Sequence, residues 1–186
     1  MIYVGHSDNK NILGAFSPKI VGSCMQLAKL CYNKKNNIDE NIFFEFYKNE
    51  TKYGIKSLNK ARNIILNEGY TYKETTEYVY KRVIKDTVKG LQKEIDVIND
   101  LYKKGYKAYF ASADIDINYS VDLICKNFSI QVKPNTYKLG NNPSLNLDKQ
   151  KHLMQHIAYQ KKYNKPVFFI YYNKNTGVLD YENFKI

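Results

Sequence analysis

The sequence contains few cysteines and almost no arginine. It also has no run of about 18 apolar residues, so it offers no candidate for a membrane-spanning helix. Its start, from Met1 to Asp8, lacks the basic-then-apolar order of a secretory signal. The three cysteines (Cys24, Cys31 and Cys125) are an odd number and show no metal-binding spacing, which indicates reduced thiols in the core. These absences predict a cytoplasmic protein that does not act at a membrane.

Positive charge is the strongest compositional feature. The chain has 29 Lys+Arg against 18 Asp+Glu, a formal net charge of +11, and Arg62 and Arg82 are its only arginines. Abundant Lys, Asn, Tyr and Ile suggest AT-rich coding, which by itself increases the number of lysines. The number of Asp and Glu residues is not increased to match, however, so an excess of positive charge remains. A basic chain with 18 tyrosines favours a polyanionic partner, above all nucleic acid, and the alternative is a merely solvated basic surface.

The first half of the chain shows helical periodicity. Ser17 and Pro18 suit the start of one helix, because serine caps helices and proline is favoured in their first turn. Ser57 similarly precedes a helical pattern that stops at Gly69. The predicted helices cover about 18–31, 57–69 and 71–102, the last bent near Gly90, and residues 42–47 are ambiguous between helix and strand.

The second half changes to strand periodicity. Predicted strands cover 106–111, 119–125, 128–133 and 166–172, with a return strand at 178–181 and a helix at 147–163. On that helix Leu153 and Ile157 share an apolar side. His152, Gln155 and Tyr159 share the opposite side, which we interpret as surface or as a face toward DNA. This order predicts an α/β core at 87–186 preceded by an α-helical N-terminal extension at 1–86.

A polar group lies within the two strands that run from Val121 to Pro134. Alternation places Gln131 and Lys133 on one face of the second strand. If Lys126-Asn127 is a two-residue turn, Asp122 lies opposite Gln131 with Cβ atoms about 5 Å apart, and Lys133 is one diagonal step away. The alternative is an ordinary amphipathic hairpin with a polar outer face.

An acid, a carbonyl and a lysine on one face can hold a divalent metal beside a phosphate. Asp122 offers a hard oxygen ligand, and the Gln131 side chain and the Val132 backbone carbonyl add neutral oxygens, which suits Mg²⁺. Lys133 can activate a water or offset charge in the transition state. Glu94, at the border of a buried helix face, would be satisfied by the metal or by Lys133, and alternatively by a surface lysine.

A helix with Glu, a strand with Asp and a strand ending in (D/E/Q)-x-K resemble the PD-(D/E)xK nuclease superfamily. The resemblance implies a mixed central sheet flanked by helices, with Asp122, Gln131, Lys133 and Glu94 as the catalytic residues. Two departures stand out: Val121 replaces the usual proline, and Gln131 replaces the usual acid, which removes one negative metal ligand.

A closer resemblance covers most of the chain. The segments SPKIVG (17–22), TVKGLQ (87–92) and above all SIQVKPNTYK (129–138) are similar to the MjaI-type family of type II restriction endonucleases. The family implies a Mg²⁺-dependent homodimer that cuts a short palindrome in double-stranded DNA. On this view residues 1–86 serve DNA recognition or dimerisation, and residues 87–186 form the catalytic core.

The segment after the lysine strand is the predicted DNA contact. Asn135, Thr136, Tyr137 and Lys138 open a stretch rich in Asn, Gly and Lys, side chains that suit base-edge and phosphate contacts. The same stretch could be a plain connection. Two other functions stay open: a non-catalytic basic nucleic-acid-binding protein, and a structure-specific repair or junction nuclease on the same fold. A pure binder has no need of the polar group around Asp122.

Overall fold

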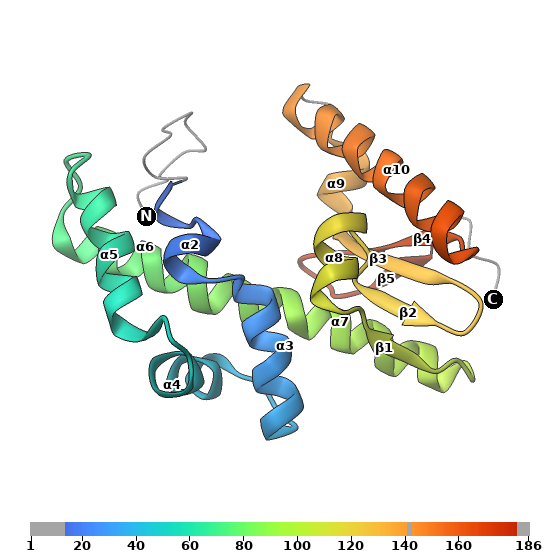
Figure 1. Ribbon diagram of the computed structural model, residues 1–186, viewed down its shortest axis with the longest axis horizontal. Coiled ribbons are helices and arrows are strands. Elements are labelled where there is room, and N and C mark those ends of the chain that lie inside the picture. Colours follow the sequence, from blue (N-terminus) through green and yellow to red (C-terminus); the bar gives the residue numbers. More distant parts are fainter. Residues whose placement is uncertain (1–13, 141–142, 182–186) are drawn as a thin grey trace. The chain divides into compact units, whose positions relative to one another are not determined.

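The computed structural model describes residues 14–140 and 143–181 (Figure 1). The chain divides into two compact units, Met1–Gln92 and Lys93–Ile186, and the division falls inside helix α7 (Asp86–Lys103). The sequence placed this boundary at 86/87, after the first residue of α7; the roles assigned to the two regions remain predictions. None of the described helices is long and apolar enough to cross a membrane.

The described part of the first unit is helical. Its elements are α2 (Pro18–Val21), α3 (Cys24–Lys35), α4 (Glu40–Glu50), α5 (Gly54–Leu66), α6 (Tyr72–Tyr80), a π-helix η1 (Lys81–Lys85) and the start of α7. Phe43 and Tyr47 are fully buried, and the Tyr47 hydroxyl donates to the Val21 carbonyl at 2.9 Å. Buried aromatic side chains from α4 therefore form part of the core of this unit.

Three helix predictions needed correction, and one open assignment is resolved. The helix expected from Pro18 to Cys31 breaks at Gly22, whose φ of +80° ends α2. The ambiguous stretch 42–47 is helical, because the Asp39 side chain caps α4 by accepting from Ile42 N–H. Helix α5 begins at Gly54, so Ser57 lies inside it. The stretch 71–102 contains the π-helix η1, and α7 continues without a break through Gly90.

The second unit is built around a five-stranded mixed sheet. Its strands are β1 (Ala108–Phe110), β2 (Leu123–Cys125), β3 (Ser129–Pro134), β4 (Val167–Tyr172) and β5 (Leu179–Tyr181), in the order β1-β2-β3-β4-β5. Among the strands of the described residues, only β3 and β4 pair in parallel. The helices are α8 (Ala113–Tyr119), α9 (Asn135–Leu139) and α10 (Pro143–Tyr163). The predicted mixed sheet flanked by helices is confirmed, although the strand predicted at 119–125 is shorter: Tyr119 is the last residue of α8, and β2 begins at Leu123.

Helices cover both faces of this sheet (Figure 1). On one face Val97 and Leu101 of α7 pack against Leu123 and Ile130, and on the other Tyr159 of α10 packs with Val121 and Ala111. Strand β3 is buried from both sides: Ser129, Ile130 and Gln131 are at most 1% exposed. The alternative of a half-exposed amphipathic hairpin is thereby excluded.

Helix α10 turns the opposite side toward the sheet from the one that its apolar residues suggest. Tyr159 and His156 are buried, whereas Leu153, Met154 and Ile157 are more than half exposed. The buried side is polar because it meets polar groups: the Tyr159 hydroxyl lies 2.9 Å from Ser129 Oγ. The interpretation of the Tyr159 side as surface was wrong.

Candidate functional site

The hairpin between β2 and β3 has the predicted register up to Leu123. Cys125 N–H donates to the Phe128 carbonyl at 2.9 Å, and Leu123 is the register partner of Ile130. At Asp122 the ladder changes, because its N–H donates to the carbonyl of that same Ile130 at 2.9 Å. Two residues of one strand then face a single residue of the other, which is the pattern of a β-bulge.

The bulge overturns the simple alternation that the sequence suggested. Val121 packs on the α10 side with Tyr159, whereas Leu123 and Cys125 pack on the α7 side. Asp122 Oδ2 accepts the Val132 N–H at 2.7 Å, so the carboxylate takes the place of a strand partner where β2 leaves β3. The N–H and C=O of an extended residue point to the same side, which directs the Val132 carbonyl toward Asp122. We call the place where β2 leaves β3, formed by Asp122 and by Gln131 and Val132 of β3, the fork.

Gln131 brings a buried amide to the fork. Its side chain is 1% exposed, and among the residues that the structure describes its Oε1 has no hydrogen-bond partner. A buried acceptor left without a donor costs about 1–3 kcal/mol. Because Ile130 packs on the α7 side, alternation places Gln131 on the α10 side.

Lys133 follows Gln131 on the same side of β3. Its Nζ lies 5.6 Å from the centre of the Tyr137 ring, and the Tyr137 hydroxyl lies 2.7 Å from His152 Nδ1. Burial, together with the charge of Lys133, lowers the pKa of His152 to about 4. Burial also lowers the pKa of His156. Both imidazoles are thus neutral near pH 7, and Lys133 supplies the positive charge in this group.

Glu94 approaches from the other face of the sheet. It is 4% exposed and lies one helical turn before Val97, on the side of α7 that packs on the strands. Lys93 Nζ lies 3.7 Å from where a Cβ of Gly177 would be, so this end of α7 is near the turn that follows β4. Since β4 is parallel to β3, Glu94 and Lys133 share one end of the sheet. Lys93, the alternative partner, instead donates to Asp96 at 2.8 Å.

The four residues predicted to contact DNA do not lie in a loop. They open helix α9, where Tyr137 is 9% exposed and faces inward. Asn135 Oδ1 is also buried, and Lys138 Nζ donates to Asp180 Oδ2 at 3.1 Å. Thr136 and Lys138 are exposed. Contacts of these four residues with DNA remain a prediction.

The polar side of α10 was interpreted as surface or as a face toward DNA, and its packing beside Tyr137 and β3 was not predicted. His152, Gln155, His156 and Tyr159 follow helical spacing as regular as that of an apolar stripe. Gln155 accepts from Ser120 Oγ at 2.7 Å and donates to the Asn118 carbonyl at 3.0 Å, so it ties α10 to α8. The regular spacing of these polar side chains was the available signal.

The donor set at the fork fits a hard cation. Within 14–140 and 143–181 no cluster of three or more His, Cys, Asp or Glu side chains could hold a metal. The fork instead combines the carboxylate of Asp122 with the carbonyl oxygens of Gln131 and Val132, and Glu94 lies at the same end of the sheet on its other face. Such oxygen ligands are those that Mg²⁺ takes in proteins, and the unpaired Oε1 of Gln131 is consistent with a cation there.

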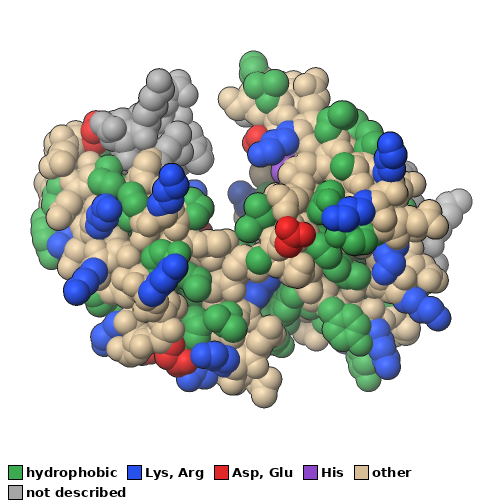
Figure 2. Space-filling model, in the orientation of Figure 1, with side chains coloured by type: hydrophobic (Ala, Val, Ile, Leu, Met, Phe, Trp, Pro, Cys, Tyr) green, Lys and Arg blue, Asp and Glu red, His purple; other side chains and the backbone are tan. Residues whose placement is uncertain are grey.

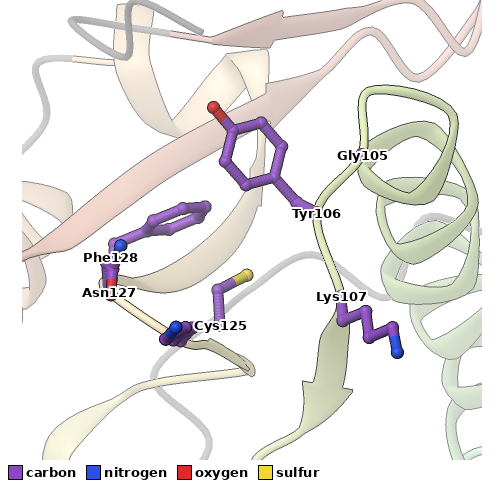
Figure 3. Close-up of a pocket in the computed structure, with 7 residues that line it drawn as sticks. Gly105, Tyr106, Lys107, Cys125, Asn127 and Phe128 are labelled. Carbon is purple, nitrogen blue, oxygen red and sulfur yellow. The ribbon is translucent and has the colours of Figure 1, made fainter.

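A cavity of about 500 Å³ lies elsewhere in the second unit (Figure 3). Gly105, Tyr106 and Lys107 line one side of it, and the turn from Cys125 to Phe128 lines the other. This turn precedes β3, so the cavity lies at the opposite end of that strand from Lys133. It holds none of the predicted site residues, and we place the chemistry at the fork.

Comparison with known proteins gave one result. The model of the MjaI restriction endonuclease family matches residues 8–183, nearly the whole chain. No curated protein and no solved structure matches the sequence.

Proposed function

This chain belongs to the MjaI restriction endonuclease family, and from that premise we propose a Mg²⁺-dependent, site-specific type II deoxyribonuclease that hydrolyses phosphodiester bonds in double-stranded DNA. The observation that carries the proposal is the fork, where the Asp122 carboxylate is fixed on the Val132 N–H beside a buried, unpaired Gln131 Oε1. A protein that only bound DNA would gain nothing from burying the Gln131 amide oxygen without a donor, since this costs stability.

Each residue at the fork has a distinct role in this proposal. Asp122, Glu94, Gln131 and the Val132 carbonyl would hold Mg²⁺, which when bound acts as a Lewis acid on the phosphate and lowers the pKa of water. Lys133 brings its ammonium toward the scissile phosphate, where it offsets the charge that grows in the transition state. Its charge also stabilises the hydroxide that forms when the attacking water gives its proton to solvent.

The substrate and the assembly follow from symmetry and charge. A net charge of +11 favours the phosphate backbone of DNA. One fork cuts one strand, so two copies related by a two-fold axis would cut both strands of a palindrome. We propose a homodimer that acts in the cytoplasm within a restriction-modification system, with the first unit contributing to DNA recognition or dimerisation. Sedimentation of the protein with and without DNA tests the dimer.

Incubation of varied plasmid and linear DNA with the protein and Mg²⁺, followed by sequencing of the cut ends, tests the activity. We expect discrete fragments with one common sequence at the ends, which disappear with chelator and with K133A. Intact DNA in both Mg²⁺ and Mn²⁺, with binding retained, would favour the non-catalytic binder. Cutting of junctions but not of linear duplex would favour a repair nuclease.

Gln131→Glu tests whether residue 131 is a metal ligand. The added carboxylate is buried beside Asp122, so without metal we expect a raised carboxyl pKa and lower stability at neutral pH. With metal the extra anionic oxygen should tighten binding, so half-maximal cleavage should need less Mg²⁺. Gln131→Leu is the control that removes the oxygen. Equal Mg²⁺ requirements in all three proteins would show that Gln131 is not a ligand.

A further inference from the structure

Tyr137 has surroundings that DNA contact does not explain. Its side chain is 9% exposed, and its ring stacks on Phe169 of β4 with centroids 6.0 Å apart and planes 28° apart. Its hydroxyl lies 2.7 Å from Nδ1 of His152 on α10. The ring is therefore fixed by β4 and by α10, and a ring held in this way can restrain a neighbouring side chain.

The group that it contacts on the site side is Lys133. Lys133 Nζ lies 5.6 Å from the Tyr137 ring centre, within the range of a cation–π interaction. Phe169, which supports the ring, is the register partner of Gln131 in the parallel β3–β4 pair. The residue that stacks on the Tyr137 ring therefore lies directly beside Gln131 in the sheet.

A second lysine approaches the same ring but has another task. Lys149 Nζ lies 5.9 Å from the ring centre and donates to the carbonyls of Lys138 and Gly140, at 3.3 and 2.8 Å. These bonds tie the end of α9 to α10. Lys149 therefore fixes the helix that carries the ring, and Lys133 is the ammonium that projects from β3.

A lysine side chain has four rotatable bonds, so its ammonium samples many positions unless something restrains it. Catalysis needs the charge within a narrow range of positions near the reacting phosphate. We propose that Tyr137 is a positioning residue for Lys133: its ring face holds the ammonium at the carboxyl end of β3, and His152 holds the ring through its hydroxyl. This inference deepens the proposed function and rests on it for its catalytic consequence.

Single-turnover cleavage at saturating DNA separates positioning from binding. Y137F keeps the ring face, and we expect a rate within about threefold of wild type, whereas Y137L should lose about tenfold or more, with the Kd for DNA unchanged. Y163L is the matched control, because Tyr163 is a partly buried ring at the far end of α10 that packs on Tyr119 and Tyr159. It should lose stability without losing rate.

A spectroscopic measurement tests the same contact without DNA. After reductive ¹³C-methylation, the Lys133 signal, assigned by its loss in K133R, should be shifted upfield by the ring current of Tyr137. The shift should persist in Y137F and vanish in Y137L. His152→Ala removes not only the hydrogen bond that Y137F also lacks but also the imidazole ring that contacts the Tyr137 ring, with centroids 5.7 Å apart, so a reduced shift and a slower cleavage rate are expected even if Y137L does not fold.

The outcomes separate the two proposals. If the wild-type protein cuts no DNA but the ring-current shift follows the ring, the proposed function fails and the Tyr137–Lys133 contact stands. If the wild-type protein cuts and Y137L cuts at the same rate, the positioning role is overturned. It is overturned equally if Y137L raises the Kd for DNA while the saturated rate stays the same, because Tyr137 would then contact DNA.

Discussion

The Asp122 carboxylate accepts the Val132 N–H at 2.7 Å, a bond that the neighbouring strand would otherwise provide. A charged acceptor strengthens such a bond. The same side chain is the leading candidate for a metal ligand, so its structural and chemical roles coincide. Substitutions that keep one role and remove the other can separate them.

Asp122→Asn and Asp122→Ala should differ in stability but not in activity. The asparagine oxygen can still accept from Val132, whereas alanine leaves this N–H without its partner, at a cost of about 1–3 kcal/mol. Both variants lose the negative charge, and we expect both to lose cleavage by at least about a hundredfold. Urea unfolding and single-turnover assays measure the two effects. Equal stability of the two variants would show that the bond to Val132 contributes little.

His152 should make the folded protein sensitive to acid. Its folded-state pKa of about 4 lies below the ordinary value of 6.5, so between these values the unfolded chain binds protons that the folded protein excludes. The contribution of neutral His152 to the free energy of unfolding is therefore fully present above about pH 6.5, and it decreases as the pH drops toward 4. Partial exposure of the ring limits the His152 contribution to about 1 kcal/mol.

His152→Gln is the variant that tests this dependence. Its loss of stability between about pH 7 and pH 5, measured by urea unfolding, should be smaller than that of the wild-type protein. The residual loss should come in part from His156, whose pKa burial also lowers. The same acid sensitivity in both proteins would contradict the assignment.

At the scale of elements, the sequence predicted which segments are helices or strands better than how they face. The mixed sheet, the helix at α10 and the β2–β3 register followed from periodicity and turn length. The bulge at Asp122 did not, because it depends on a hydrogen bond between a side chain and a neighbouring strand. The buried side of α10 did not either, since the sheet beneath it presents Ser129, which only tertiary contact reveals.

Gly22 separates α2 from α3 for a reason that a substitution can test. Its φ of +80° is rarely adopted by other residues, and a Cβ there would lie 2.6 Å from Tyr53 and 2.9 Å from Leu27. We expect Gly22→Ala to destabilise the protein by about 2–4 kcal/mol. Gly69→Ala is the control: it has φ +92° but nothing within 4 Å of the added carbon, so it should cost about 1 kcal/mol. Thermal unfolding would show whether the two variants differ.

At the scale of the whole molecule, lysine supplies nearly all of the positive charge. Lys and Arg side chains are spread over the face shown in Figure 2, and acidic side chains are few there. A dispersed positive surface binds a phosphate backbone with little preference for sequence. Affinity and specificity should therefore come from different residues.

Binding to DNA should weaken steeply with salt, and particular lysines should set the slope. Each phosphate contact contributes about 0.9 to the slope of log K against log salt, so Lys138→Ala should reduce the slope by about one contact if this exposed lysine meets DNA. Lys126→Ala, at the opposite end of β3, is the matched control and should leave it unchanged. Filter binding at several salt concentrations measures the slope. Equal slopes for both variants would remove Lys138 from the interface.

The parallel partner of β3 comes late in the chain. Ser129 N–H donates to the Pro166 carbonyl at 2.8 Å, and Gln131 and Lys133 face Phe169 and Tyr171 across the β3–β4 ladder. A ribosome delivers the fork residues first and β4 only after α10 has been made. A nascent or prematurely terminated chain that stops before β4 lacks the strand that fixes β3 and the ring that supports Tyr137. For the proposed nuclease activity, we expect that a chain ending before β4 does not cut DNA, which a cleavage assay on such a truncated protein would test.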